Sequence, residues 1–406
     1  MQPGGAGGTK ECMFARIALL ALLTSAPPIT QNHIELVESV PIETTLGHDD
    51  IQNASVVWLE MIEHAKTSLD LAQFYVSDRA GGPLTPIIEA IEKAAQRGVR
   101  VRFLADAKFH KTYPEILDRL GKVKNIEMRL YDMKPLTGGV LHAKYFIVDG
   151  TSGYLGSQNF DWRSLEHIQE LGARIDDAGL ATSLRDVFDL DWAIAGGEPR
   201  PAVHAADRTL IENANTPDAS RTTLVGSPKE LLPESVPWDL PRIVALIDGA
   251  KTSVRVQVLT YKMTGSNEYF SELENALRRA ATRNVSVELL VADWCMRKGT
   301  IEGLQSLEPL ANIEVKLVTI PQWSGGYVPF ARVVHSKYLV VDGKNAWLGT
   351  NNWEKGYFYA SRNVGLIIEG GAIPNRLDGL FADLWSSAYA KPVDPCAKYT
   401  APKTGE

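Results

Sequence analysis

The chain has 406 residues, of which 45% are hydrophobic and 22% are charged, so it can bury two sizeable hydrophobic cores and is not a largely disordered protein. The formal net charge of −7 excludes a general basic field that would attract nucleic acid, so any binding of nucleic acid would rest on a local groove.

The first 26 residues have the pattern of a secretory signal peptide. Lys10 and Arg16 precede a short apolar run over residues 17–23, and small residues follow at 24–26. The run is shorter than the roughly 20 apolar residues needed to span a bilayer. We therefore expect a secreted or extracytoplasmic protein, in the periplasm or outside the cell, or in a lysosomal type of lumen if the source is eukaryotic.

Predicted elements recur in two halves of the chain. Apolar residues have helical spacing over residues 86–98 and again over 271–283, and each is followed by a β-branched run that predicts a buried strand. Short segments repeat as well, such as residues 65–69, which return at 250–254. The pattern predicts two α/β sandwich domains related by pseudo-twofold symmetry. We expect a signal peptide at 1–26, an N-terminal domain at 27–195, a connection at 196–237, a C-terminal domain at 238–392 and a tail at 393–406.

One string of polar residues, H-x-K-x4-D-x6-G-[ST]-x-N, occurs once in each half. The first copy contains His142, Lys144, Asp149, Gly156, Ser157 and Asn159; the second contains His335, Lys337, Asp342, Gly349, Thr350 and Asn352. Each copy begins in an apolar run, 141–148 or 333–341, that predicts a strand, in which the His and Lys would point to the same side. Asp149 and Asp342 have the opposite parity and precede a glycine, so we interpret these aspartates, with Gly156 and Gly349, as structural.

Two imidazoles and two ammonium groups in one pocket suit a phosphodiester. One neutral histidine can attack phosphorus while the other, protonated, donates to the leaving oxygen, and the lysines offset charge on the remaining oxygens. Asn159 and Asn352 can donate further hydrogen bonds to phosphate. A lone His-x-Lys would usually be structural. Burying the pair twice would cost roughly several kcal/mol for each unpaired charge, and a functional role explains such a cost better than a structural one, so the repeat favours an active site.

The pattern predicts no metal and no other cofactor, because the lysines supply positive charge and the chain has no zinc-ligand spacing. Cys295 and Cys396 would remain after removal of the signal peptide, and the sequence leaves open whether they pair.

The doubled motif resembles the phospholipase D superfamily. Residues 136–142, 159–165, 328–333 and 349–358 look like the branch that contains phospholipases D3 and D4, and the similarity runs from about residue 36 to 384. The resemblance implies a duplicated phospholipase D fold with one active site at the interface of the two domains. That branch includes lysosomal 5′-exonucleases on single-stranded DNA and RNA, with lipid transphosphatidylation also attributed to it. It lacks the aspartate of its second motif, whereas Asp342 is present here.

Glu170 is a further candidate catalytic residue. It lies 28 residues after His142, and the same offset from His335 falls on Asn363. In the superfamily a carboxylate around this position hydrogen-bonds the far nitrogen of a motif histidine. We therefore predict that His142, backed by Glu170, is the nucleophile and His335 the general acid, with the reversed assignment left open.

The residues beside the motifs do not decide the substrate. We expect Ser157, Thr350, Trp162, Trp353 and Tyr357 to line it, where the aromatic rings could stack bases, line a lipid pocket or pack the interface. The predicted function is a phospholipase D-type phosphodiesterase that hydrolyses or transphosphatidylates phospholipids through a covalent phosphohistidine. The alternatives are a 5′-exonuclease on single-stranded DNA or RNA using the same site, and an inactive phosphate-ester-binding protein. No stable protein partner is implied, while peripheral membrane contact and the oligomeric state stay open.

Overall fold

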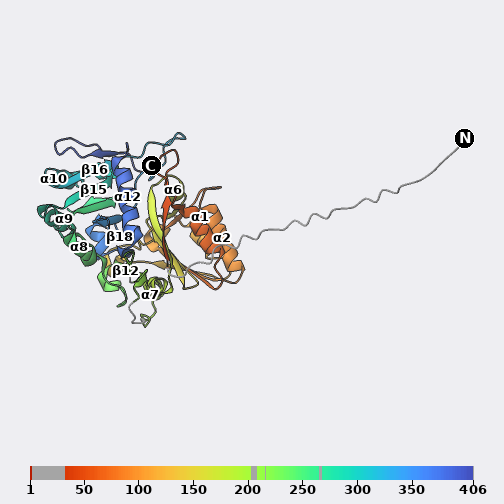
Figure 1. Ribbon diagram of the computed structural model, residues 1–406. Coiled ribbons are helices and arrows are strands. Elements are labelled where there is room, and N and C mark those ends of the chain that lie inside the picture. The colour runs from red at the N-terminus through yellow and green to blue at the C-terminus, as the bar shows by residue number, and fades with distance from the viewer. Residues whose placement is uncertain (2–32, 203–207, 215, 265–267, 406) are drawn as a thin grey trace. The chain divides into compact units, whose positions relative to one another are not determined.

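Two β-sheets, one from each half of the chain, form the framework of the computed structural model (Figure 1). The structure describes Met1 and residues 33–405, apart from 203–207, 215 and 265–267. The predicted signal peptide therefore lies outside the described residues, except for Met1. The described residues between 33 and 405 pack as one unit.

The first sheet has eight strands in the order β2-β1-β10-β8-β7-β3-β5-β6. Three of them, β3, β5 and β6, run parallel, and β7 and β8 add an antiparallel hairpin beside β3. The strands are β1 (His33–Ser39), β2 (Gln52–Asn53), β3 (Ser68–Gln73), β5 (Arg100–Asp106), β6 (Ile126–Tyr131), β7 (Tyr145–Val148), β8 (Ser152–Gly156) and β10 (Glu170–Asp176).

The second sheet repeats this order. Its strands lie in the order β11-β12-β20-β18-β17-β13-β15-β16-β21, so that β20-β18-β17-β13-β15-β16 corresponds to β10-β8-β7-β3-β5-β6. The predicted duplication is confirmed. The strands are β11 (Leu210–Glu212), β12 (Ser220–Ser227), β13 (Ser253–Val258), β15 (Ser286–Ala292), β16 (Ile313–Val318), β17 (Tyr338–Val341), β18 (Asn345–Gly349), β20 (Asn363–Gly370) and β21 (Ala390–Pro392).

The stretch assigned to the connection, residues 196–237, contributes strands to the second sheet. β12 pairs with β20 over its whole length, from Ser220 opposite Gly370 to Ser227 opposite Asn363. It holds the place that β1 holds beside β10 in the first sheet. The stretch around it is rich in Pro, Gly, Ala, Asn and Ser, which is why the sequence predicts a connection there.

Helices cover the outer faces of both sheets and fill the space between them. Helices α1 (Ala54–Glu63) and α2 (Thr85–Gln96) pack on the first sheet, and α8 (Asp239–Gly249) and α9 (Glu272–Thr282) pack on the second, at opposite sides of the molecule in Figure 1. In α2 the apolar residues at three- and four-residue spacing form one buried face, as predicted. Helices α7 (Ala178–Ala195) and α12 (Ala372–Ser386) lie in a central core that both sheets share.

The remaining elements are short. They are β4 (Val76–Ser77), α3 (Ala107–His110), α4 (Glu115–Leu120), α5 (Lys134–Thr137), β9 (Phe160–Asp161), α6 (Trp162–Glu166), the 3-10 helices η1 (Lys229–Leu231) and η2 (Asp293–Met296), β14 (Tyr261–Lys262), α10 (Ile301–Leu307), β19 (Trp353–Glu354) and α11 (Lys355–Tyr359). No helix in the described part of the chain combines the length and apolar character that a membrane span requires. Cys295 is buried and Cys396 exposed, and both are free thiols.

Candidate active site

The two copies of the motif meet where the halves of the chain join. Leu141 forms a bridge to Arg362, and the backbone N–H of His142 donates to the carbonyl of Arg362 at 3.0 Å. The second copy repeats the arrangement, since Val334 bridges to Gln169 and the N–H of His335 donates to the carbonyl of Gln169 at 2.8 Å. Each motif is therefore held by the backbone of the opposite half. Both motifs thus lie at the interface of the two halves, as the prediction of a single shared site requires.

The motif histidines precede their strands instead of lying within them. Strand β7 begins at Tyr145 and β17 at Tyr338, so His142, Lys144, His335 and Lys337 lie in extended segments just before them. The prediction that these residues form part of the strand was wrong, because the N–H groups of His142 and His335 bond to the opposite half. The carbonyls of Lys144 and Lys337 still accept from the N–H groups of Gly156 and Gly349 in their own sheets.

Glu170 pairs with the histidine of the other half. Its Oε2 lies 2.7 Å from Nδ1 of His335, whereas Nδ1 of His142 lies 2.9 Å from Oδ1 of Asn363. The prediction that Glu170 backs His142 was wrong. Glu170 begins β10, directly after the residue that bonds the second motif, so the exchange of backbone bonds between the halves also exchanges the partners of the two imidazoles.

The Asn363 amide fixes the tautomer of His142. Its Nδ2 donates to the carbonyl of Tyr357 at 2.8 Å, so Oδ1 faces His142 and accepts its Nδ1–H. Nε2 of His142 then carries a lone pair. Burial, followed by the charges of Lys144 and Lys337, lowers the pKa of His142 well below its usual value, which keeps the ring neutral.

His335 has a counter-charge that His142 lacks. Burial lowers the pKa of His335 to about 4, against the opposing effect of Glu170. Burial alone would raise the pKa of Glu170, but His335 and Lys337 bring it below its usual value, so this carboxylate is ionised. Its second oxygen accepts a hydrogen bond from Ser164 at 2.8 Å. Of the two imidazoles, His335 is thus the one equipped to carry a proton.

The two lysines are buried beside the histidines. Nζ of Lys144 donates to the carbonyl of His142, and Nζ of Lys337 donates to the carbonyl of His335. Burial lowers the pKa of Lys337 to about 7 and the pKa of Lys144 well below its usual value, the latter with help from the charge of Lys337. A phosphodiester anion between these ammonium groups would supply the missing counter-charge.

The motif asparagines also reach the site. Asn159 and Asn352 are buried, and neither side-chain oxygen has a hydrogen-bond partner among the described residues. An amide oxygen only accepts hydrogen bonds, so these oxygens do not suit a phosphate anion. The N–H groups of the same amides are donors, and it is through them that the two asparagines can bind phosphate oxygens.

The remaining members of the motif shape the backbone. Asp149 accepts hydrogen bonds from the backbone N–H groups of residues 66–68, and Asp342 accepts the same set from residues 251–253. A Cβ on Gly156 would lie 2.8 Å from Cα of Gly172, and one on Gly349 would lie 2.5 Å from the Trp347 ring. These residues have the structural role that the sequence predicted.

Three of the residues predicted to line the substrate are packed inside the protein. Trp353 is 0% exposed and packs near Tyr261 in the core of the C-terminal half. The hydroxyl of Ser157 donates to the carbonyl of Leu171, and that of Thr350 donates to Oδ1 of Asn363. The predictions for Trp353, Ser157 and Thr350 were wrong, because proximity to the motif in sequence does not determine which face of the chain is open.

The other two aromatic predictions fall at partly exposed positions. The Tyr357 ring lies 4.6 Å from the His142 ring, measured between centroids, so it borders the site. Trp162 lies beneath the guanidinium of Arg79, at 4.3 Å, and edge-on to His167.

Phe74 borders the site and was missed in the sequence. Its ring lies 5.0 Å from the His142 ring, and Nζ of Lys144 lies 4.8 Å from its centroid. Phe74 directly follows β3, one of the parallel strands. Because functional residues of α/β sheets gather at the carboxyl ends of such strands, this position was the signal that could have identified it.

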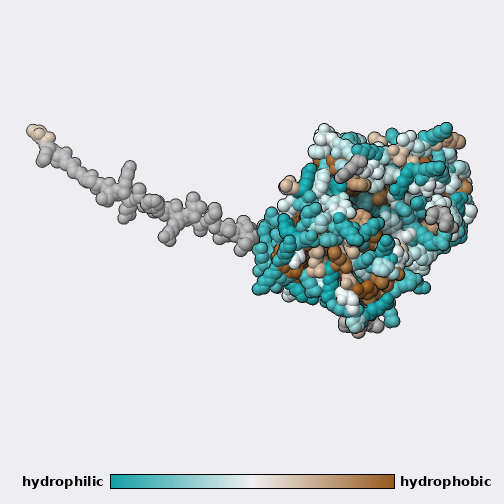
Figure 2. Space-filling model, turned by 180° about the vertical axis from the view of Figure 1, so that it is seen from behind, coloured by the Kyte–Doolittle hydropathy of each residue, from teal (hydrophilic) through white to brown (hydrophobic). Residues whose placement is uncertain are grey.

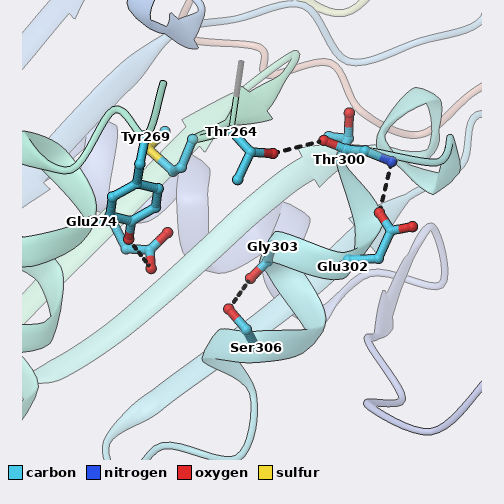
Figure 3. A pocket seen from close by; sticks show the side chains of 9 residues that line it. Thr264, Tyr269, Glu274, Thr300, Glu302, Gly303 and Ser306 are labelled. Atoms are coloured by element: carbon cyan, nitrogen blue, oxygen red, sulfur yellow. Dashed lines mark hydrogen bonds between the residues drawn. The ribbon is translucent and has the colours of Figure 1, made fainter. Parts of the chain in front are cut away.

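A separate cavity of about 310 Å³ lies in the C-terminal half and contains no motif residue (Figure 3). Its polar groups bond to one another: Tyr269 donates to Glu274 at 2.6 Å, and Ser306 donates to the carbonyl of Gly303 at 2.7 Å. In the part of the chain that the structure describes, no three His, Cys, Asp or Glu side chains are grouped as metal ligands would be.

Two sheets of duplicated topology with a shared pair of H-x-K motifs define a phospholipase D-like protein. The family model described as "Cardiolipin synthase, PLD-like domain" matches residues 58–192 and 243–385, and the chain belongs to this family. The protein is a phosphodiesterase of the phospholipase D superfamily.

Its relatives include proteins named for action on nucleic acid. The chain is 32% identical to the "5′-3′ exonuclease PLD3" of Xenopus laevis over 87% of this chain and 80% of the relative. It is 31% identical to the "5′-3′ exonuclease PLD4" of Mus musculus, with coverage of 88% and 79%. The fold matches the phosphatidylserine synthase of Haemophilus influenzae with a TM-score of 0.58, at 14% identity and 85% coverage of both chains.

Proposed function

We propose that the protein cleaves the phosphodiester bonds of single-stranded nucleic acid through a covalent phosphohistidine on His142. The observation that carries the proposal is the unequal support of the two imidazoles, Asn363 at His142 and Glu170 at His335. The roles of the two histidines are those predicted from the sequence, His142 as nucleophile and His335 as general acid. The reason differs, because Glu170 supports the acid and not the nucleophile. The amide keeps the nucleophile neutral, and the carboxylate stabilises the proton on the general acid.

In the first step, Nε2 of His142 attacks phosphorus and the bond to the leaving oxygen breaks. Nε2 of His335 gives its proton to that oxygen, and Glu170 stabilises the imidazolium before transfer. Lys144 and Lys337 offset the charge on the non-bridging oxygens, with the amides of Asn159 and Asn352 as further donors.

In the second step, His335 accepts a proton from water, whose oxygen attacks phosphorus. The bond from phosphorus to His142 breaks, which returns the neutral nucleophile and the protonated acid. The product is a phosphate monoester. Replacement of water by an alcohol would give a transfer product by the same route.

Support for nucleic acid as the substrate comes from two sources. The relatives named above as exonucleases match most of the chain. The aromatic rings of Phe74 and Tyr357 also flank His142, where a base attached to the reacting phosphate would lie. On the face seen in Figure 2, hydrophobic residues form separate patches in a mainly polar surface.

The covalent step can be tested with a p-nitrophenyl phosphodiester, whose leaving group does not need an acid. The His335→Asn variant should release about one nitrophenol per molecule in a burst and gain the mass of the phosphoryl ester, because the acid is dispensable and the base for water is missing. The His142→Asn variant should show neither. A burst of equal size in both variants would contradict a nucleophilic role for His142.

The substrate can be tested by offering the wild-type protein a 5′-hydroxyl single-stranded oligonucleotide and phosphatidylcholine micelles, each with EDTA. Shortening of the oligonucleotide from one end, abolished by His142→Asn, is expected. Headgroup release without oligonucleotide loss would favour the lipid function instead. Strong inhibition by EDTA would contradict the metal-independent mechanism.

A further inference from the structure

Four partly exposed aromatic rings lead away from His142. Phe74 is the first, and Phe109 lies 4.0 Å from it between ring centroids. Tyr75 lies 6.0 Å from Phe109, and Tyr113 stacks on Tyr75 at 5.0 Å. We call these four residues the aromatic wall. None of them belongs to the three hydrophobic cores of the protein, so their rings are not there to fill an interior.

The wall is tied to the catalytic segment. Asp106 caps α3, which carries Phe109, by accepting from the N–H of Phe109 at 3.0 Å. The other oxygen of Asp106 accepts from the N–H of Leu141, the residue before His142, at 2.8 Å. At the far end, the Tyr75 hydroxyl donates to Asp161 at 2.9 Å. The rings are therefore held in a fixed position relative to the nucleophile.

Positive charge accompanies the rings. Lys108 and Lys111 on and beside α3 are exposed, and Nζ of Lys108 lies 5.6 Å from the Phe109 centroid. The guanidinium of Arg163 lies 6.0 Å from the Tyr113 centroid, but it is buried and paired with Asp161, so the exposed positive charge beside the rings comes from the two lysines. Rings that stack with bases and cations that follow the backbone are the combination with which proteins bind single strands. It supplies the local binding surface that a chain of net charge −7 would need for nucleic acid.

The other half of the pseudo-symmetric site has no counterpart of the wall. By the repeat, Leu259 and Thr260 take the positions of Phe74 and Tyr75, and Met296 takes that of Phe109. The C-terminal half builds the same sheet without these rings, so the fold does not require them. The row of four rings is thus a feature of the N-terminal half, while the C-terminal half contributes Tyr357 beside His142.

We propose that the aromatic wall is a base-stacking subsite that holds the nucleotide next to the scissile phosphate and so sets the direction in which a single strand enters. The proposal rests on the proposed function, since it specifies the substrate of the same site. The wall accepts any base, because every base presents a flat face, and it discriminates against diesters that lack one.

The experiment compares an oligonucleotide with an otherwise identical one that is abasic at its two terminal nucleotides. For the wild-type protein, kcat/KM should be about tenfold or more higher with the bases present. In Phe109→Leu and Tyr113→Leu, which keep bulk and lose the ring, this ratio should fall toward one. Phe109→Trp should restore it, and Met296→Leu, the matched change in the other half, should leave it as in the wild type.

Thermal unfolding checks that each variant is folded, and the ratio between two substrates cancels a general loss of active protein. An unchanged ratio in both leucine variants would overturn the aromatic wall and leave the proposed function intact. Failure of the wild-type protein to cleave any oligonucleotide while it cleaves the lipid would instead overturn the proposed function.

Discussion

At the scale of single residues, one difference between the halves decides which histidine is the nucleophile and which is the general acid in the proposed reaction. Residues 142 and 335 are both histidines with a lysine two positions later, but their partners are an amide and a carboxylate. A neutral partner favours the neutral imidazole, and an anion favours the imidazolium. The difference of one side chain therefore separates nucleophile from acid in a pocket that is otherwise repeated.

Loss of the carboxylate should weaken the acid. In Glu170→Gln, His335 loses the negative charge that favours its protonated form, so its pKa falls further below the usual value. We expect kcat for an oligonucleotide to fall about 10- to 100-fold and its alkaline limb to move to lower pH, because His335 must be protonated to act. A pH profile of kcat measures both. An alkaline limb that stays in place would contradict the role of Glu170.

The opposite change should weaken the nucleophile. In Asn363→Asp, a new carboxylate beside Nδ1 of His142 raises the pKa of this imidazole. Because the nucleophile must be neutral, the acidic limb of the pH profile should move to higher pH, with activity retained on its alkaline side. Paired measurement with Glu170→Gln is the control, since the two variants should move opposite limbs. Movement of the same limb in both would mean that the roles are assigned wrongly.

The sequence predicted which residues form the site better than it predicted which of them are hydrogen-bonded to one another. The two H-x-K strings and their structural aspartates were found from spacing, and Glu170 was identified through the resemblance to the superfamily. The exchange of partners between the halves was not, because an offset within one half contains no information about pairing across an interface. Phe74 and Phe109 were missed for a related reason, since each joins the site through the edge of a sheet and lies far from the motif in sequence.

At the scale of elements, each motif strand is anchored to the turn before the parallel strand that it pairs with, β3 or β13. Asp149 and Asp342 both have positive φ, at 53° and 55°, and each accepts three backbone N–H groups and a threonine hydroxyl. This repeated clamp joins β7 to the turn before β3 and β17 to the turn before β13. Helix α2 and the parallel strands were predictable from periodicity, whereas β12 was not, because its pairing with β20 is decided by tertiary packing.

Removal of either clamp should cost stability and spare the chemistry. Asp149→Ala leaves several backbone donors without their partner, which should lower the free energy of unfolding by about 1–3 kcal/mol. Asp342→Ala is the matched variant and should lose a similar amount. Urea unfolding measures the loss, and kcat per folded molecule should stay near the wild-type value. A large loss of kcat without loss of stability would place these aspartates in the reaction.

The contribution of each clamp to the stability of the protein should also depend on pH. Burial alone would raise the pKa of Asp149, but the N–H groups of Ser68 and Thr67 bring it below its usual 3.8. A depressed folded-state pKa contributes stability above the unfolded-state value, and this contribution is lost as pH falls through the folded-state value. The stability difference between wild type and Asp149→Ala should therefore be constant near neutral pH and shrink below about pH 4.

At the scale of the whole molecule, the halves are joined by a shared core and by one buried ion pair. Arg362 bonds Asp191 of α7 through two hydrogen bonds of 2.8 and 2.7 Å, and both side chains are fully buried. The same guanidinium donates to the carbonyls of Ser227 and Leu231. The backbone of Arg362 also holds His142. One residue of the C-terminal half thus fixes a helix of the N-terminal half and the nucleophile together.

The ion pair should be far more costly to break than to replace. Arg362→Met alone leaves Asp191 buried without its cation, and Asp191→Leu alone leaves the guanidinium without its anion, so each single change should lower the free energy of unfolding by about 3–5 kcal/mol. The double variant leaves no buried charge at this place and should lose clearly less than the sum of the two, because apolar side chains of similar volume can fill the same core. Urea unfolding of the wild type, both single variants and the double variant measures the coupling. Additive losses would mean that the pair contributes no mutual stabilisation, and the link between the halves would then rest on the shared hydrophobic core and the hydrogen bonds around the two motifs.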